Sequence, residues 1–328
     1  MSAPLALVTG ASGFVGSHIV DELLRRGARV RCLLRATSSR RWLDGKTVEF
    51  AEADVGSPEG LDKAVAGADW IVHAAGLTHA RSAAEFHKAN VDGTENILAA
   101  ALRSDPKPRR FLYISSQAAA GPSLDDGPVT EDLPARPVSS YGNSKLAGEL
   151  LVMRAADRLP VVTIRPPTVY GPRETSLLKY FRAVKVHLRP EPGGPRFLSV
   201  VYAEDHARAV WECLNQDAAV GQIYFVGGPD LTSFQELGDV IERAMKTRAL
   251  RFPVPSFLLQ AGALAGEAIG ALTGRAPFFS REKFREITAG PWTVSSRKIR
   301  DQLGWTSMTS LEEGVHATAR WYREAGWV

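Results

Sequence analysis

The sequence predicts an α/β protein with a doubly wound parallel sheet, followed by a smaller, mainly helical C-terminal lobe. Three observations lead to this prediction. An apolar run near the N-terminus ends in closely spaced glycines and continues as a helical pattern. Short apolar runs then alternate with helical patterns through the first half of the chain, which is typical of parallel strands joined by crossover helices. Beyond Pro172 proline and basic residues become more frequent, and there we expect the chain to leave the sheet.

A glycine-rich turn joins the first strand to the first helix. The apolar residues 5–8 are followed by Thr-Gly-Ala-Ser-Gly-Phe-Val-Gly at positions 9–16. Glycines in such a turn let the backbone approach a phosphate closely and let the helix pack against the strand, while the free N–H groups of the helix start attract the anion. We therefore predict that a dinucleotide binds here. The residues expected to contact it are Gly10, Ser12, Gly13, Phe14, Val15 and Gly16.

The remaining elements of the first half follow in order. Further strands are expected at residues 30–34, 47–53, 70–76, 110–116 and 161–165, and helices at 18–27, 61–66, 83–102 and 140–156. Ligands on such sheets lie at the carboxyl ends of the strands. Residues from several strand ends are therefore expected at one edge, beside the dinucleotide. These are Gly10, Arg35, Asp54, Val55, Ala74, Ala75, Gly76 and Ser116. His73, inside an apolar strand, is expected to be a hydrogen-bonded core residue.

The end of the second strand indicates which dinucleotide is preferred. NAD-binding sheets of this kind place a carboxylate about 20 residues after the glycines, where it binds the ribose. No carboxylate occurs between Glu22 and Asp44, whereas Arg35 follows the strand and Arg40 and Arg41 come soon after. Arginine pairs with a 2′-phosphate that a carboxylate would repel. We expect NADP(H) to be preferred, with Arg35 and Arg40 as contacts and NAD(H) as the alternative.

A tyrosine and a lysine one helical turn apart indicate the chemistry. Tyr141 and Lys145 share a helix face because they are four residues apart. An ammonium group ~4 Å from the phenol, at an effective dielectric of ~20, favours the phenolate by roughly 4 kcal/mol, or about three pKa units. We expect Lys145 to lower the pKa of Tyr141 toward physiological pH, so that Tyr141 exchanges a proton with a substrate oxygen. Ser116, at the end of a strand, is the candidate to hold that oxygen.

These motifs together resemble the extended short-chain dehydrogenase/reductase family. The matching segments are residues 9–16, Ser115-Ser116, Tyr141 with Lys145, Arg-Pro-Pro-Thr-Val-Tyr-Gly-Pro at 165–172, and residues 311–314. The resemblance implies a Rossmann-type domain, with Tyr141 as acid/base, Lys145 as its modulator and the clamp on the nicotinamide ribose, and Ser116 as the stabiliser of the reacting oxygen. It also implies a cofactor contact at Pro166. Many members of the family form homodimers through two long helices, which here correspond to residues 83–102 and 140–156.

The second half is expected to be divided between two lobes. The dinucleotide domain spans residues 1–172, with returns at about 198–228. The rest of 173–328 builds mainly the substrate lobe, from about 173–197 and 229–310, and the C-terminal helix.

Two departures argue against a nucleotide-sugar substrate. The nucleotide-sugar branch of the family carries asparagine where Thr168 stands and an arginine near Leu198 and Ser199, although Arg196 or Arg173 could substitute. We expect a small, largely apolar ketone or secondary alcohol, as in the dihydroflavonol reductase and 3β-hydroxysteroid dehydrogenase branches. A nucleotide-sugar epimerase or dehydratase with tightly held NAD is the alternative, and a non-catalytic assembly subunit is a second one.

An apolar helical stripe within residues 255–274 has three readings. It consists of Phe257, Leu258, Ala261, Leu264, Ala265, Ala268, Ile269 and Leu272, with Gln260 and Glu267 opposite. The stripe could pack as lobe core, contact an apolar substrate, or dock on lipid. We expect lobe core. Docking on lipid is disfavoured because the opposite face carries few basic residues.

Composition and charge exclude some function classes and set the expected compartment. The formal charge of +4 in 328 residues arises without a basic block, so nucleic-acid binding is not indicated. Cys32 and Cys213 lie in apolar surroundings without metal or disulfide spacing, and are expected to be reduced core residues. Without a leader pattern or an apolar run of roughly 20 residues, the expectation is a cytoplasmic protein with no transmembrane segment.

Overall fold

The computed structural model describes residues 3–328 except 124–126, 193–195, 230, 275 and 278. Its centre is a seven-stranded parallel sheet with the strand order β11-β6-β5-β4-β1-β2-β3, so the predicted doubly wound architecture is confirmed. The strands are β1 (Leu5–Thr9), β2 (Arg29–Leu34), β3 (Glu49–Glu52), β4 (Trp70–His73), β5 (Arg110–Ile114), β6 (Val161–Arg165) and β11 (Ile223–Phe225). The order in which the chain adds strands to the sheet reverses between β1 and β4. Sheets of this kind bind ligands at this point.

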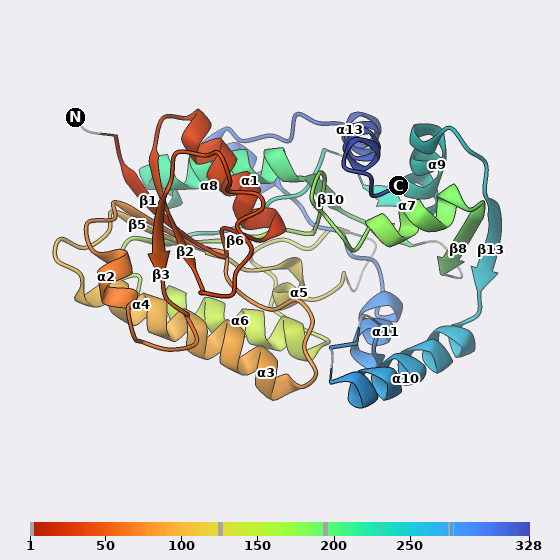
Figure 1. Cartoon of the computed structure of the whole chain (residues 1–328), viewed down its shortest axis with the longest axis horizontal. Helices are drawn as coiled ribbons and strands as arrows, with labels where there is room; N and C mark the ends of the chain where they lie inside the picture. Colours follow the sequence, from red (N-terminus) through yellow and green to blue (C-terminus); the bar gives the residue numbers. More distant parts are fainter. Residues whose placement is uncertain (1–2, 124–126, 193–195, 230, 275, 278) are drawn as a thin grey trace.

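Two helical layers enclose the sheet (Figure 1). On one face lie α1 (Phe14–Arg25) and α8 (Ala203–Asn215), and on the other lie α2 (Leu61–Val65), α4 (Gly93–Arg103) and α6 (Ser140–Met153). The central strands β1, β4, β5 and β6 are buried along their whole length, as expected for parallel strands covered on both sides. Short elements complete this half of the molecule. They are α3 (Ala83–His87), the π-helix η1 (Lys88–Asp92), α5 (Gln117–Ala120) and the 3-10 helix η2 (Asp217–Ala219).

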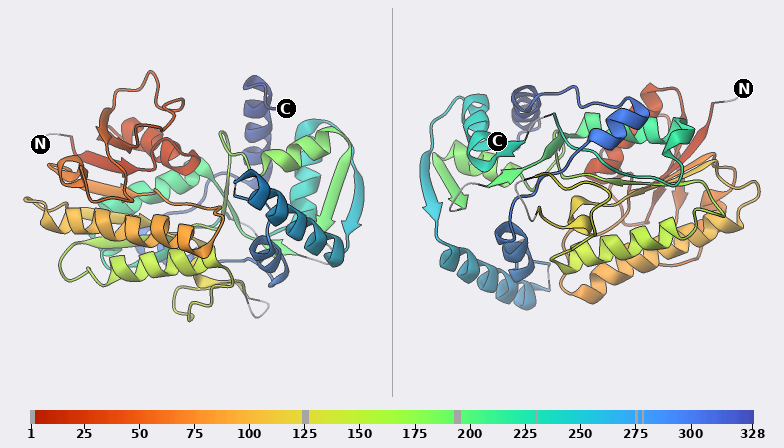
Figure 2. Two further views of the ribbon diagram at one scale, coloured as in Figure 1. Left: turned by 60° about the horizontal axis from the view of Figure 1, so that its bottom comes forward. Right: turned by 180° about the vertical axis from the view of Figure 1, so that it is seen from behind.

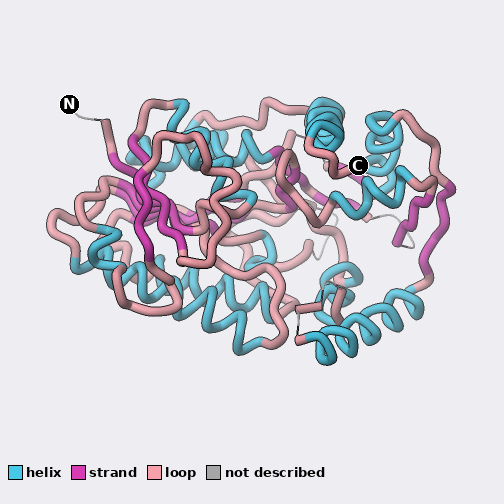
Figure 3. Tube along the Cα trace, viewed as in Figure 1, coloured by secondary structure: helices cyan, strands magenta, loops and turns pink. Residues whose placement is uncertain are grey.

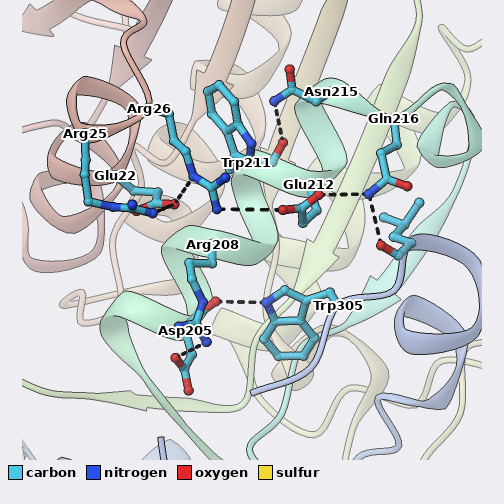
Figure 4. A network of polar contacts seen from close by, with 11 residues as sticks. Glu22, Arg25, Arg26, Asp205, Arg208, Trp211, Glu212, Asn215, Gln216 and Trp305 are labelled. Carbon is cyan, nitrogen blue, oxygen red and sulfur yellow. Dashed lines mark hydrogen bonds and ion pairs between the residues drawn. The ribbon is translucent and has the colours of Figure 1, made fainter. Parts of the chain in front are cut away.

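A polar network fastens α8 to α1 and to the C-terminal segment (Figure 4). Arg26, the C-cap residue of α1, donates to Glu22 at 2.9 Å and lies 3.9 Å from Glu212 on α8. The Gln216 side chain then donates to Glu212 and to the Leu303 carbonyl. These contacts hold the first helix, whose N-terminus forms the glycine turn, against an element nearly 200 residues later in the chain.

The second lobe lies beyond the carboxyl ends of the strands and is mainly helical (Figures 1 and 2). Its elements are α7 (Leu178–Lys185), β8 (Leu188–Pro192), α9 (Phe234–Met245), β13 (Leu250–Val254), α10 (Ser256–Thr273), α11 (Arg281–Thr288) and α13 (Leu311–Glu324). The core of this lobe lies where α7, α9 and α13 meet, around Phe181, Ile241 and Tyr322. The strands β8 and β13 form a separate parallel pair, visible in Figure 3 at the edge of the molecule.

Small strand pairs connect the two lobes. They are β7 (Thr168–Tyr170) with β10 (Val200–Tyr202), and β9 (Phe197–Leu198) with β12 (Thr232–Ser233). The chain returns to the main sheet at β11, whereas β10 pairs with β7 outside it. A second return lies in α12 (Arg297–Leu303), where Ile299, Leu303 and Trp305 pack in the core of the sheet. We expected these three residues in the smaller lobe, but the apolar face of α12 packs on β11.

Candidate active site

The glycine turn lies against the end of β4, where no side chain fits. A Cβ atom on Gly10 would lie 2.8 Å from the Ala74 carbonyl and the Ala75 nitrogen, and Gly10 has a φ of +68°. A Cβ atom on Gly16 would lie 2.1 Å from the Gly10 oxygen. Gly10 and Gly16 are therefore required sterically, which brings the start of α1 onto the edge of the sheet.

The start of α1 meets the requirements of a pyrophosphate site. Gly13 is exposed, occupies the N-cap in an extended conformation, and offers no side chain to the free N–H groups of the first turn. The first turn also contains no acidic residue. Half-buried Ser12, Phe14 and Val15 flank this position, so a dinucleotide would be held by backbone N–H groups, as predicted.

The predicted contacts to the adenosine half lie on two neighbouring loops. Arg35 is exposed directly after β2, and its backbone N–H donates to Ser38. Arg40 instead stacks on Phe50 of β3, with its guanidinium carbon 4.4 Å from the ring centroid. Asp54 follows β3 and accepts a hydrogen bond from the Gly56 N–H, and the Val55 carbonyl accepts one from Asn96. Of the two arginines, Arg35 is the one whose side chain has no cation–π partner among the described rings.

A buried hydrogen-bond chain fixes the loop after β4. The Thr9 hydroxyl accepts from the Ala75 N–H at 3.0 Å and contacts His73 Nδ1 at 2.7 Å. His73 Nε2 lies 3.0 Å from the Thr94 hydroxyl, which itself donates to a backbone carbonyl. Burial lowers the pKa of His73 to about 3, so its ring is neutral. His73 is thus a hydrogen-bonded core residue, as predicted, and it holds Ala74, Ala75 and Gly76 in place.

Tyr141, Ser116 and Lys145 meet at this same edge. Ser116 is the N-cap of α5, where its hydroxyl accepts from the Ala118 N–H at 3.1 Å, and it lies near enough to the Tyr141 phenol to act on its pKa. Lys145, one turn along α6, is buried with its Nζ atom 4.3 Å from the Tyr113 ring centroid. A Cβ atom on Gly76 would lie 3.9 Å from that Nζ. The proposed catalytic groups therefore lie beside the predicted dinucleotide site.

The pKa expectation for Tyr141 is wrong in direction. Burial raises the pKa of Tyr141 to about 12, with the Glu286 carboxylate acting in the same sense and the Ser116 hydroxyl acting against it. Burial also lowers the pKa of Lys145 to about 7, although Glu149 raises it. The low dielectric around both groups disfavours both charges and outweighs the Coulomb attraction between them. The phenol is held in its protonated form.

Asn90 is a buried site residue that the sequence reasoning missed. It lies in the π-helical turn η1, between α3 and α4. Its carboxamide accepts from the Leu77 N–H at 2.7 Å and donates to the Leu77 carbonyl at 3.0 Å and the Ser144 hydroxyl at 2.9 Å. Asn90 therefore joins the loop beside Gly76 to the residue before Lys145. An asparagine inside a predicted helix of residues 83–102 gave no signal of this, since only the π-turn directs it inward.

The position of α6 is fixed by a buried ion pair and by a glycine. Glu149 accepts two hydrogen bonds from Arg165 on β6, at 2.5 and 2.9 Å, and both side chains are almost fully buried. A Cβ atom on Gly148 would lie 2.5 Å from the Tyr113 hydroxyl and 2.7 Å from the Asn90 carbonyl. These contacts lie one to two turns beyond Tyr141 and hold the helix that carries it. Pro166 follows Arg165 at the same edge, and its carbonyl accepts from the Gln117 N–H.

The second lobe contacts the start of α6 through α11. Glu286 accepts a hydrogen bond from the Ser139 hydroxyl at 2.6 Å, and Glu282 accepts from the Ser140 N–H and hydroxyl. Ser139 also caps α6, since its hydroxyl accepts from the Gly142 N–H. The substrate lobe is thus joined to the dinucleotide domain within two residues of Tyr141.

Comparison with known proteins identifies the family. The sequence model of the NAD-dependent epimerase/dehydratase family matches residues 6–227. The chain belongs to this family. It is also 33% identical to a ceramide reductase of Caulobacter vibrioides, over 98% of this chain and 95% of that protein. A 4-hydroxy-2-methyl-3-oxo-4-farnesyl-3,4-dihydroquinoline-1-oxide ketoreductase of Stigmatella aurantiaca is 30% identical over 97% of this chain and 96% of its own length.

Solved structures share the whole fold. The crystal structure of gox2253 is 27% identical, with a TM-score of 0.82 over 99% of each chain. DesIV, a dTDP-glucose 4,6-dehydratase of Streptomyces venezuelae solved with NAD and TYD, is 25% identical, with a TM-score of 0.79 over 98% of each chain. The resemblance to extended short-chain dehydrogenases/reductases is therefore confirmed. This family member is an NAD(P)-dependent enzyme acting on CH–OH or C=O groups.

Proposed function

We propose that the enzyme reduces a ketone, or oxidises the corresponding secondary alcohol, on an apolar substrate with NADP(H). The observation that carries this proposal is the convergence of Ser116 and Tyr141 at the strand edge, with Lys145 one turn along the same helix. A protonated phenol and a hydroxyl directed at one point are suited to a carbonyl oxygen that becomes an alkoxide.

Each side chain has a distinct task in the reduction. A bound nicotinamide supplies the hydride to the carbonyl carbon. Tyr141 donates its phenolic proton to the carbonyl oxygen, since the phenol is in its protonated form at neutral pH. Ser116 donates a hydrogen bond to the same oxygen as its charge develops. Lys145, whose Nζ lies near Gly76, would hold the ribose of a bound dinucleotide, and Asn90 holds the loop beside Gly76.

The preference for NADP(H) rests on Arg35. It is exposed immediately after β2, at the position where a ribose-binding carboxylate is missing. Replacing it by alanine should weaken NADPH binding by about 1.5–3 kcal/mol and leave NADH binding nearly unchanged. Arg103→Ala, which removes an equal charge paired with Asp62, is the matched control. Tighter binding of NADH than NADPH by the unmodified enzyme would refute the assignment.

A long-chain ketone is the substrate class we propose. Two relatives that match nearly the whole chain are named for a ceramide and for a farnesylated quinoline. Long-chain 3-keto amides and prenylated ketones are therefore the first compounds to assay with NADPH, by loss of nicotinamide absorbance. Activity confined to short polar ketones would contradict this choice.

The nucleotide-sugar alternative receives support from relatives but less from the site. A dTDP-glucose 4,6-dehydratase of Streptomyces niveus is 28% identical over 97% of this chain. However, Arg173 is bound to Asp21 at 2.7 Å and to Ser17, and Arg196 donates to the Ile287 carbonyl. Neither arginine is free for a diphosphate. An increase in melting temperature with a sugar nucleotide, together with NAD that remains bound through purification, would favour the alternative.

Tyr141→Phe tests the mechanism itself. Loss of the proton donor should lower turnover by about 10²–10⁴-fold, while the affinity for NADPH stays nearly constant because the ring remains. Phe86 contacts the Tyr141 ring at 5.8 Å between centroids, and Phe86→Leu serves as a packing control. Unchanged turnover in Tyr141→Phe would exclude the mechanism, whereas absence of turnover in the unmodified protein would favour a non-catalytic assembly subunit.

A further inference from the structure

The helix α10 has its apolar face toward solvent. The side of the helix that faces the protein contains Leu259, Ala263, Gly266, Glu267 and Gly270. The opposite side is exposed and apolar. It consists of Phe257, Leu258, Ala261, Leu264, Ala265, Ala268, Ile269 and Leu272. The exposed fractions reach 66% for Phe257 and 88% for Leu272.

This orientation is the reverse of that of an ordinary surface helix. The expectation that the stripe forms lobe core is therefore wrong. Of the 18 residues of α10, only Ala263 and Gly270 are buried, and neither belongs to the stripe. By length and composition, α10 is the one described helix that could cross a membrane. Contiguous apolar surface of this kind marks a binding site for an apolar partner. We call this face, made of the eight residues above, the α10 apolar face.

Basic residues flank the α10 apolar face in the sequence. Between positions 246 and 290 there are seven lysines and arginines against three acidic residues. The basic residues are Lys246, Arg248, Arg251, Arg275, Arg281, Lys283 and Arg285. Two of the three acidic groups, Glu282 and Glu286, are bonded to the start of α6. Three of the basic residues are ion-paired, Arg251 with Asp239, Arg281 with Glu267 and Lys283 with Glu286. An apolar face beside excess positive charge is complementary to an anionic bilayer.

The contacts of α10 indicate that it lies along a bilayer rather than across it. Glu267 accepts from the backbone N–H and the side chain of Arg281, at 2.9 and 2.7 Å. A Cβ atom on Gly266 would lie 2.3 Å from the Phe279 carbonyl, so the chain leading into α11 lies tightly against one side of the helix. A spanning helix would have to carry this ion pair and this attached segment into hydrocarbon.

The helix pair α10–α11 lies beside the candidate active site. The helix α10 packs on α11, and α11 bonds to Ser139 and Ser140 immediately before Tyr141 (Figure 1). A bilayer against α10 would therefore lie one helix away from the start of α6, where Tyr141 lies.

We propose that the α10 apolar face docks on an anionic lipid bilayer, in the plane of its interface, and brings the site to its substrate at the membrane. The docking itself is independent of catalysis. Only the delivery of a long-chain substrate rests on the proposed function.

The first test is co-sedimentation of the full chain with lipid vesicles. The protein should sediment with vesicles of phosphatidylcholine and phosphatidylglycerol in equal parts, and bind phosphatidylcholine vesicles more weakly. Leu264→Glu/Leu272→Glu should weaken binding at least about tenfold, because each leucine loses its apolar contact and adds a negative charge. The control Val220→Glu/Met308→Glu adds the same charge at exposed apolar positions elsewhere and should bind like the unmodified protein.

A second measurement does not depend on disruptive substitutions. Both native cysteines are buried, so a Leu272→Cys variant can be labelled selectively with an environment-sensitive fluorophore. Its emission should shift to shorter wavelength when anionic vesicles are added, whereas a label on Met308→Cys should not shift.

Three results would overturn docking. These are absence of sedimentation with anionic vesicles, equal binding by the Leu264→Glu/Leu272→Glu variant, and a dimer in solution that this variant converts to a monomer without any vesicle binding. The last result would assign the face to a second copy of the chain. Tyr141→Phe separates the two proposals, because it should lose turnover and still sediment with vesicles.

Discussion

The Glu286 carboxylate on α11 accepts a hydrogen bond from the Ser139 hydroxyl, 2.6 Å away and two residues before Tyr141. This contact joins the substrate lobe to the helix that carries the phenol. It also places a negative charge near enough to raise the pKa of Tyr141. Movement of α11 would therefore change both access to the site and the acidity of its proton donor.

Glu286→Gln should make Tyr141 more acidic. Removing the negative charge removes a contribution that raises the pKa of Tyr141, while the amide oxygen can still accept from Ser139. Alcohol oxidation requires the phenolate, so its pH–rate limb should move to lower pH. Below the limb, the rate should rise about tenfold for each unit by which the pKa falls. Glu282→Gln, which alters a neighbouring contact to Ser140, should leave the limb in place.

Asn90→Ala should lower kcat at least about tenfold and destabilise the fold by about 1–3 kcal/mol. The substitution leaves the Leu77 backbone groups and the Ser144 hydroxyl without their amide partner. Asn96→Ala removes a single hydrogen bond to the Val55 carbonyl and should have a smaller effect on both quantities. Urea denaturation and steady-state kinetics measure them, and equal kcat values in the two variants would contradict a positioning role for Asn90.

Gly10→Ala and Gly27→Ala separate backbone strain from lack of space. Both glycines have positive φ, +68° and +83°, so alanine should cost about 1–2 kcal/mol at either position. A Cβ atom at Gly27 meets nothing within 4 Å, whereas at Gly10 it meets the Ala74 carbonyl at 2.8 Å. Gly10→Ala should therefore cost a further 1–3 kcal/mol or so and weaken dinucleotide binding. Calorimetry with and without NADPH would show this, and identical affinities in the two variants would argue against the pyrophosphate site.

Buried histidines should make the protein sensitive to acid. Burial lowers the pKa of His206 to about 4, and that of His18 to about 4. Between pH 6.5 and 4 the unfolded chain binds more protons, so the free energy of unfolding falls as the pH falls. His206 should account for up to about 3 kcal/mol of this loss. In His206→Gln the slope of unfolding free energy against pH should decrease by up to one proton, and an unchanged slope would contradict the assignment.

Local patterns in the sequence predicted the sheet and most of the site. The glycine turn, the alternation of strands and helices, and the spacing of Tyr141 and Lys145 each depend on neighbours within a few residues. The return of Ile299 and Trp305 to the sheet core could not be predicted, because it depends on contacts with segments far away in the sequence.

The solvent exposure of the α10 apolar face could also not be predicted from the sequence. Periodicity showed that Phe257 and Leu264 share a helix face, but the same period fits a face that is covered and one that is open. In the same way, the spacing of Tyr141 and Lys145 gives their attraction but not the loss of hydration, which determines the direction of both pKa shifts.

Because Gly148 has no side chain, α6 can pack closely enough to set the position of the Tyr141 phenol. Seven residues after Tyr141, the α6 backbone rests directly on the Tyr113 hydroxyl and the Asn90 carbonyl. A single methyl group at Gly148 would push α6 outward. It would thereby move Tyr141 away from the substrate carbonyl that we propose it protonates. We therefore expect turnover to depend on close backbone packing two helical turns away, at a position outside the proposed catalytic groups.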